Sequence, residues 1–223
     1  MQKIGYQTGQ RPFGVRQNIA MISQFLATEA QNAIDIGCSE GLISMALADS
    51  GLSVTGYEGS KEAYSSALKH QNPQKNINFI NCKLSLADVE ALPQVDVIVL
   101  LSVHHQMVKN LGLSDANHFL KVLAKKARLQ LFFQPCCIHE KYGIEMPFSN
   151  NDYPAIENYF IDLVNSSESE LRYHQVIGLS FNDIPKKEPF RPMILFSKAP
   201  IKQRQPSIVA SNDILFKSRL IGN

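Results

Sequence analysis

The sequence predicts an α/β fold built on a doubly wound, mostly parallel sheet. Short apolar segments alternate with amphipathic helical segments between residues 17 and 133, a rhythm typical of parallel βαβ units. A glycine turn follows the first apolar segment directly, at Gly37. Near the end of the chain, two strand-like segments follow one another without a helix between them. Such a pair indicates a closing antiparallel hairpin.

Each element is predicted from its own pattern. The Gly-rich and polar residues 1–16 are expected to be a loop, and an apolar face formed by Ile19, Ile22, Phe25 and Leu26 predicts a helix over residues 17–27. Strands are expected at residues 32–36, 53–57, 76–81, 95–101 and 128–133, and helices at 41–49, 61–70, 115–126 and 152–165. The hairpin strands are 171–181 and 190–197. These elements predict a domain over residues 1–198 and an extension over 199–223.

Composition bounds the class of protein. The chain has 223 residues, 44% of them apolar, and a formal net charge of +2, which is enough for one domain with a two-faced core. This balance favours neither a nucleic-acid nor a membrane partner. The N-terminus shows no apolar signal core, and no apolar run approaches ~20 residues. Four cysteines near strand ends suit reduced thiols. A cytoplasmic protein without a membrane span is expected.

The turn after the first strand is the most informative segment. It reads Ala33-Ile34-Asp35-Ile36-Gly37-Cys38-Ser39-Glu40-Gly41, and Glu58 closes the second strand. In an open α/β sheet, ligands bind beyond the carboxyl ends of the strands, where glycine lets the backbone approach and an acid accepts ribose hydroxyls. Ser39 breaks the dinucleotide pattern Gly-x-Gly-x-x-Gly, which disfavours NAD. The structural alternative is that the glycines only shape a turn and that Glu58 is a solvated acid beside a helix start.

Asp-x-Gly-x-x-x-Gly followed by Glu resembles the first two motifs of class I S-adenosylmethionine (SAM) methyltransferases. The resemblance covers about residues 30–198, including the closing hairpin, and implies a Rossmann-like seven-stranded sheet with SAM as cofactor. Many relatives place an acid after the third strand to receive the adenine amino group, whereas this chain offers Asn81 or a backbone group near Leu84. The cofactor contacts implied within the domain are Asp35, Gly37, Ser39, Gly41, Glu58, Asn81 and Ser102.

The fourth strand runs into Ser102-Val103-His104-His105-Gln106. This segment resembles the Ser-Val-x-His-His segment of small-molecule and glycan-directed methyltransferases, with His105 at the first His and Gln106 replacing the second. Imidazole titrates near neutral pH and can remove a proton from an attacking hydroxyl. His105 is therefore the first catalytic candidate and His104 the second; the alternative is that both bond loop backbone. A metal site would require His139 and Glu140 as well, and we expect none.

The opening segment offers Tyr6, Arg11 and Arg16. Arginine presents a planar fork suited to a carboxylate, and the methionine end of SAM carries one. This segment and Phe190-Arg191-Pro192-Met193 resemble parts of the methyltransferase domain in the methyltransferase–kinases that terminate bacterial O-antigen chains. Residues 1–16 are therefore expected to cover the cofactor. The alternative is that these arginines are ordinary surface charges.

The resemblances together imply a SAM-dependent methyltransferase acting on an oxygen, hydroxyl or phosphate, of a small molecule or glycan. Nitrogen-directed RNA methylation is an alternative, disfavoured because no Asn/Asp-Pro-Pro-Tyr/Phe motif follows the fourth strand and no strongly basic face is evident. A SAM-binding module without catalysis is another. The sequence predicts neither the acceptor nor the oligomeric state.

Overall fold

A seven-stranded sheet lies at the centre of the computed structural model, which describes residues 7–8, 11–181 and 190–204. The strand order is β3-β2-β1-β4-β5-β7-β6. The bounds are β1 Asn32–Ile36, β2 Ser53–Glu58, β3 Ile77–Asn81, β4 Val95–Leu101, β5 Ala127–Gln134, β6 Tyr173–Phe181 and β7 Phe190–Ser197. Strands β1 to β5 pair in parallel, and β7 is antiparallel to both β5 and β6. The predicted fold class is confirmed.

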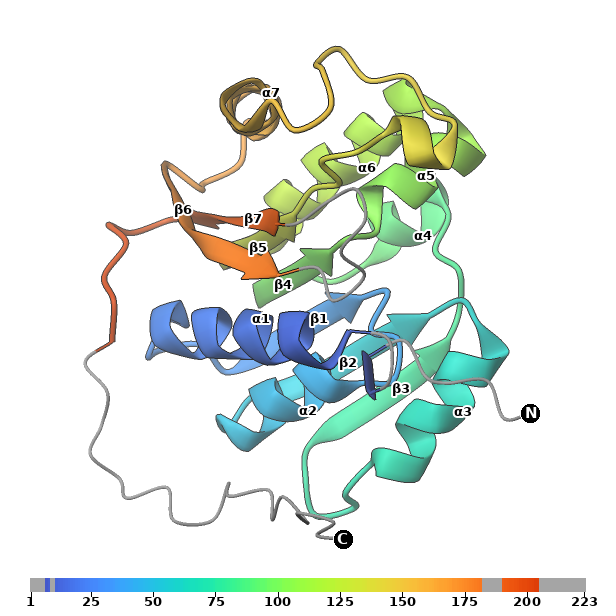
Figure 1. The fold of residues 1–223 in the computed structure, drawn as a ribbon. Coiled ribbons are helices and arrows are strands. Elements are labelled where there is room, and N and C mark those ends of the chain that lie inside the picture. The colour runs from blue at the N-terminus through green and yellow to red at the C-terminus, as the bar shows by residue number, and fades with distance from the viewer. Residues whose placement is uncertain (1–6, 9–10, 182–189, 205–223) are drawn as a thin grey trace, which may run out of the picture.

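Helices cover both faces of the sheet (Figure 1). Their bounds are α1 Pro12–Phe25, α2 Leu42–Asp49, α3 Lys61–His70, α4 Leu86–Ala91, α5 His104–Leu111, α6 Leu113–Lys126 and α7 Tyr153–Asn165, with a short 3-10 helix, η2, at Glu140–Tyr142. One core packs α1 to α3 against the sheet, and a second core packs α4, α6 and α7 against the other face. Four successive β4 residues, 97–100, are fully buried, as expected for a central parallel strand.

The strand order reverses between β1 and β4, which lie side by side although β2 and β3 separate them in the sequence. Ligands of open α/β sheets bind outside the carboxyl ends of the strands at such a switch point. The ends of β1 and β4 are Ile36 and Leu101. The fold therefore directs the glycine turn and the Ser102–His105 segment to the same edge of the sheet.

The first helix begins earlier than predicted. Helix α1 starts at Pro12, so residues 12–16 are helical and not part of a loop. Proline is well suited to the first helical position, because its missing N–H would have had no partner there and its φ is already helical. Arg11 is the N-cap residue of this helix. Tyr6 lies outside the described residues.

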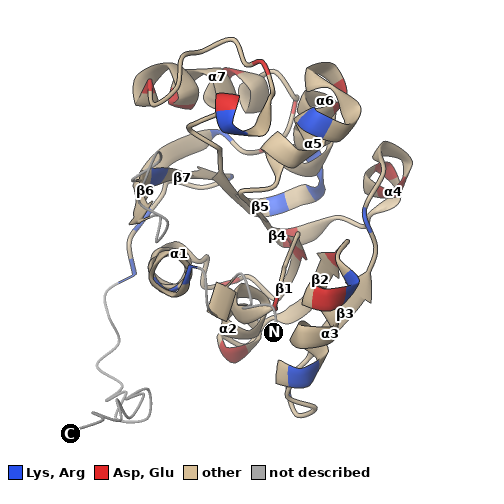
Figure 2. Cartoon of the chain, turned by 45° about the vertical axis from the view of Figure 1, so that its right-hand side comes forward, with Lys and Arg blue, Asp and Glu red and all other residues tan. Residues whose placement is uncertain are grey.

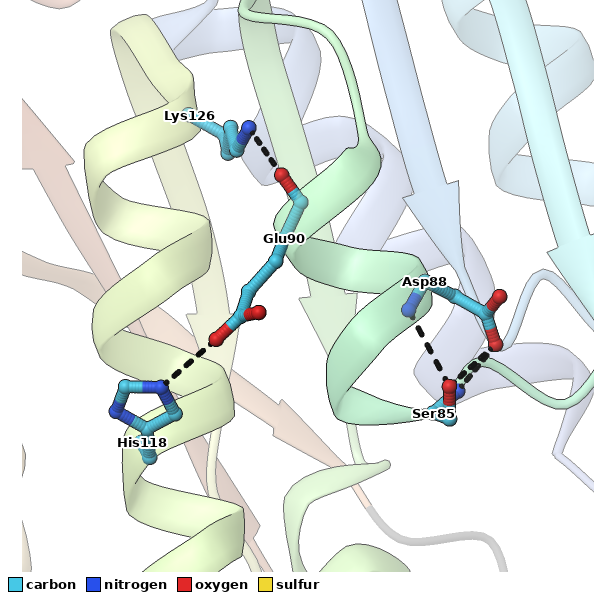
Figure 3. Close-up of polar contacts among 5 residues, drawn as sticks. All are labelled: Ser85, Asp88, Glu90, His118 and Lys126. Atoms are coloured by element: carbon cyan, nitrogen blue, oxygen red, sulfur yellow. Dashed lines mark hydrogen bonds and ion pairs between the residues drawn. The ribbon is translucent and has the colours of Figure 1, made fainter.

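Helices α4 and α5 were not predicted. Helix α4 begins with a capping box in which the Ser85 side chain accepts from Asp88 N and Asp88 accepts from Ser85 N. Figure 3 shows this cap and the contacts from α4 to α6: Lys126 Nζ donates to Glu90 O at 2.6 Å, and His118 lies 3.4 Å from the Glu90 carboxylate. The cap supplies partners for the first amides of a helix of only six residues.

After β7 the chain returns to α1, where Arg204 N donates to Gln24 O at 2.7 Å and Ile201 packs on the α1 side of the core. The rest of the predicted extension, residues 205–223, lies outside the described part of the chain. Among the helices that are described, none combines the length and the apolar character needed to cross a membrane.

Replacing Gly41 by alanine should destabilise the fold more than the same change at Gly51. Both glycines have positive φ, +79° and +95°, so each substitution should cost about 1–2 kcal/mol of backbone strain. A Cβ at Gly41 would also lie 2.5 Å from Phe79 Cζ, whereas nothing lies within 4 Å of one at Gly51. We expect a further loss of about 1–3 kcal/mol for Gly41→Ala, measured by urea unfolding. Equal losses would show that the Phe79 contact relaxes freely.

Candidate functional site

The turn after β1 is held against the end of β2 by three backbone amides. Gly37 N and Cys38 N both donate to Tyr57 O, at 2.8 and 3.0 Å, and Ser39 N donates to Glu58 Oε2 at 2.8 Å. Within this turn Gly37, Ser39 and Gly41 all have positive φ. The predicted motif residues therefore form one compact structure at the carboxyl edge of the sheet.

The structure gives Gly37 a second reason to be glycine. A Cβ at this position would lie 2.5 Å from Val103 Cγ2. Val103 is the N-cap residue of α5, so the missing side chain lets the turn after β1 pack directly under the segment that follows β4. Gly37 thus brings two parts of the site together, beyond any approach it offers to a ligand.

Glu58 is engaged on both carboxylate oxygens. Oε2 accepts from Ser39 N, and Oε1 accepts from Ser60 N at 2.7 Å. Each oxygen retains a second lone-pair position, so the carboxylate can still accept from a hydroxyl. Asn81, which pairs with Glu58 across β2 and β3, donates its side-chain amide to Glu58 O at 2.7 Å. Glu58 and Asn81 therefore lie together at the same edge.

Asp35 is a buried acid that is hydrogen-bonded to Ser44. It is 3% exposed and accepts from Ser44 Oγ at 2.6 Å. Burial raises the pKa of Asp35 to about 7, the Ser44 bond opposes this rise, and the nearby Glu58 charge adds to it. A nearby cation would favour the ionised carboxylate and lower this pKa.

The N-terminal segment lies on the glycine turn. Gln7 Nε2 donates to Cys38 O at 3.2 Å, Gln7 Oε1 accepts from Leu42 N at 3.0 Å, and Thr8 N donates to Glu40 Oε2 at 2.7 Å. Gln7 was not predicted, and its amide joins the two ends of the turn. Arg11 follows this segment and is buried, whereas Arg16 is exposed on α1, because the helix starts before it.

A small cavity of about 40 Å³ joins these elements. Its lining includes five predicted cofactor contacts: Arg11, Asp35, Gly37, Ser39 and Ser102. Gln7, Asn18 and Gln134 also line it. Ligand pockets usually measure ~300 Å³ or more, so this cavity by itself is smaller than a cofactor site. Gly41, Glu58, Asn81, Arg16 and both candidate histidines do not line the cavity.

His104 faces the core and not the crevice, which corrects the prediction for this residue. It is 2% exposed, its Nε2 lies 3.2 Å from Asn117 Oδ1, and its ring packs edge-on against Phe133 and Phe160. Burial lowers its pKa to about 4. Asn117 donates in turn to Tyr159 OH at 2.6 Å. Because α5 begins at His104, adjacent histidines project to different sides of the helix.

His105 lies on the other side of α5, against Tyr142 of η2, with ring centroids 4.1 Å apart. It is 4% exposed, and its Nδ1 has no hydrogen-bond partner among the described residues. The pKa of His105 is lowered to about 3, first by burial and then by the charges of Arg191, His104, Lys141 and Arg11. Its ring is therefore neutral at physiological pH.

Arg191 is the main site residue that sequence reasoning missed. It is 2% exposed at the start of β7, where Nη1 donates to Ser102 Oγ at 2.7 Å and Nη2 donates to Tyr142 OH at 3.3 Å. Ser102 Oγ also donates to Gln134 Oε1 at 2.8 Å. The sequence does contain a signal for this residue, namely an arginine inside an otherwise apolar strand. Arginine is rarely fully buried unless it is paired.

The remaining metal alternative finds no support in the described residues. Both ring nitrogens of His139 face backbone carbonyl oxygens, of Ile144 at 3.2 Å and of Phe148 at 2.8 Å. No group of three or more His, Cys, Asp or Glu side chains suited to a metal ion occurs in the described part of the chain. Basic and acidic residues are mixed over the helices (Figure 2).

Comparison with known proteins supports the resemblance. A family model described as a methyltransferase domain matches residues 34–129. No curated protein sequence matches the chain. The crystal structure of WbdD has a TM-score of 0.69 and 20% identity, over 90% of this chain and 45% of WbdD; another structure describes WbdD as a bifunctional kinase-methyltransferase. The chain thus spans about half the length of WbdD.

Magnesium protoporphyrin IX methyltransferase (ChlM) from Synechocystis PCC 6803, solved with bound S-adenosylhomocysteine (SAH), is also similar. Its TM-score is 0.61 at 14% identity, over 89% of this chain and 90% of that one. Residues 34–129 thus match a methyltransferase-domain family model, and the chain has the fold of these SAM-dependent methyltransferases.

Proposed function

We propose that this chain transfers a methyl group from SAM to an oxygen, hydroxyl or phosphate, of a small molecule or glycan. The observation that carries the proposal is the cavity that Arg11, Asp35, Gly37, Ser39 and Ser102 line together. These residues come from the N-cap of α1, from β1 and the turn after it, and from the residue after β4, and they meet at the switch point of the sheet. Convergent polar groups in one cavity of this kind mark a ligand site.

The residues fit SAM at both ends. The Arg11 guanidinium suits the methionine carboxylate. The buried Asp35 carboxyl suits the amino group of SAM, whose positive charge would favour the ionised form of Asp35. Glu58 retains acceptor positions for ribose hydroxyls, and Asn81 beside it is the candidate for the adenine. When bound, SAM supplies an electrophilic methyl group on a sulfonium. Protein residues then have to place the acceptor oxygen and exclude water.

The neutral state of His105 changes its expected role. A general base works best when its pKa lies near the working pH, and the pKa of His105 is lowered to about 3. The ring is better suited to orient an acceptor through a hydrogen bond than to remove a proton. An orienting role differs from general-base catalysis, in which the rate would rise with pH as the base loses its proton.

Methyl transfer from labelled SAM to acceptors of different classes tests the function directly. Hydroxyl, phosphate and nitrogen acceptors should be offered in parallel, with RNA included among the nitrogen acceptors. Transfer to an oxygen supports the proposal. Transfer to nitrogen alone would contradict it, and tight SAH binding without transfer to any class would favour a binding module.

Glu58→Ala should weaken SAH binding roughly ten- to a hundredfold, because a hydrogen bond to a charged group contributes about 1.5–3 kcal/mol. The change also removes the acceptor of Ser39 N, so the melting temperature should be recorded beside the calorimetric Kd. Glu29→Ala, at an exposed acid between α1 and β1, is the control and should leave the Kd unchanged. Unaltered binding in Glu58→Ala would restrict Glu58 to holding the turn.

SAH affinity should rise with pH up to about 7 and then level off. The pKa of Asp35 is raised to about 7, so below that pH the carboxyl is protonated, and a cationic amino group must displace its proton to pair with it. One linked proton gives a slope of up to about tenfold per pH unit. Calorimetry from pH 5 to 8 measures it, and Asp35→Asn should remove the slope. A flat wild-type profile would place the amino group elsewhere.

His105→Ala should lower turnover at least about tenfold, the cost of one hydrogen bond to the acceptor, with SAH affinity unchanged. The ring is neutral across the physiological range. The pH–rate profile of the wild-type protein should therefore have no inflection near pH ~6.5 that is due to His105. His118→Ala, exposed on α6, is the control. An inflection lost only in His105→Ala would restore the general-base role.

A further inference from the structure

The buried cluster around Arg191 is distinct from the cavity that holds the proposed cofactor contacts. It contains Arg191 from β7, His105 from α5, Tyr142 from η2 and Ser102 from the end of β4. Only Ser102 belongs to both sets. The cluster therefore lies next to the cofactor cavity and shares one hydroxyl with it.

We infer that this cluster is an oxyanion subsite, in which Arg191 and His105 bind a negatively charged oxygen group of the methyl acceptor. This inference rests on the proposed function and narrows its acceptor to an anion, of the phosphate or the carboxylate type. Arginine suits such groups because its guanidinium is a planar fork; within the cluster, Nη1 and Nη2 of Arg191 donate to neutral hydroxyls, those of Ser102 and Tyr142. His105, in its neutral form, can carry its proton on Nδ1 and donate it.

The His105 ring has a buried nitrogen that a ligand could bind. A buried ring nitrogen without a partner is costly, yet Nδ1 of this 4%-exposed side chain has no hydrogen-bond partner among the described residues. The ring is held in place by Tyr142, whose hydroxyl accepts from Arg191 Nη2. Arg191 and His105 are thus fixed on the same aromatic side chain.

Positive charges surround the His105 ring. Arg191, Lys141 and Arg11 all act on His105 as positive charges and keep its ring neutral. Lys141 is exposed, with Nζ 5.4 Å from the centre of the Tyr142 ring, whereas Arg191 is buried. Positive charge therefore extends from the surface into the cluster, an arrangement that attracts an anion from solvent and binds it strongly where water is excluded.

An anionic acceptor also agrees with the neutral state of His105. A hydroxyl acceptor needs a base, and His105 is poorly suited to that role because its pKa is low. An oxyanion is already deprotonated at neutral pH and needs only to be oriented. The neutral, hydrogen-bonding His105 and the cationic Arg191 provide orientation and charge.

The test titrates inorganic phosphate and, separately, acetate into the SAH-saturated protein at constant ionic strength, while the 15N resonances of the His105 ring are followed. The two anions distinguish a phosphate-type from a carboxylate-type group. We expect at least one to shift the His105 resonances saturably, and Arg191→Gln to weaken that binding at least about tenfold. Arg172→Gln, at an exposed arginine outside the cluster, should have no effect.

Because Arg191 is buried, Arg191→Lys is a second variant that keeps the charge and removes the fork; it should weaken anion binding less than Arg191→Gln. The other possibility is that Arg191 binds the carboxylate of the cofactor. Calorimetry with SAH and with 5′-methylthioadenosine, which lacks the amino-acid end, tests it. If Arg191→Gln weakens SAH but not methylthioadenosine, Arg191 binds the cofactor carboxylate and the inference is wrong. A wild-type His105 that responds to neither anion also overturns it. Failure of SAH to bind wild-type protein would instead contradict the proposed function, and the anion titration would still decide the subsite.

Discussion

The attachment of the β1 turn to the end of β2 is the interaction on which the rest of the site depends. Two amides share Tyr57 O and a third binds Glu58, so the left-handed residues of the turn are fixed by the neighbouring strand. The same turn supports Val103 above it and receives Gln7 on its outer side. A shift in this attachment would displace the cofactor cavity and the start of α5 together.

Two environments of opposite character meet at Ser102. On one side lies a buried acid, Asp35, whose pKa is raised because its surroundings exclude water. On the other side lies Arg191, whose charge helps to keep His105 neutral. The first suits the cationic amino group of a methyl donor, and the second suits an anionic acceptor. Under the proposed function, this division would let one crevice bind two ligands of opposite local charge.

Much of the fold was predictable because the strands are apolar, short and separated by clear turn residues. The errors have identifiable causes. The composition of residues 12–16 predicts a loop, whereas the segment is helical because Pro12 is a favourable first helical residue. The Ser85–Asp88 capping pattern marks the start of α4 and was readable in the sequence. Helix α5 begins at His104, so this side chain is buried in the core and not in the crevice where a catalytic residue is expected. Arg191 stands out in its apolar strand, but its contacts with Ser102 and Tyr142 join segments far apart in the sequence and could not be predicted from a local pattern.

A crystal structure of the protein with SAH tests the central claim most directly. We expect the amino-acid end of SAH between Arg11 and Asp35 and the ribose hydroxyls at Glu58. SAH bound with its amino-acid end away from Asp35 and its ribose away from Glu58 would contradict the account.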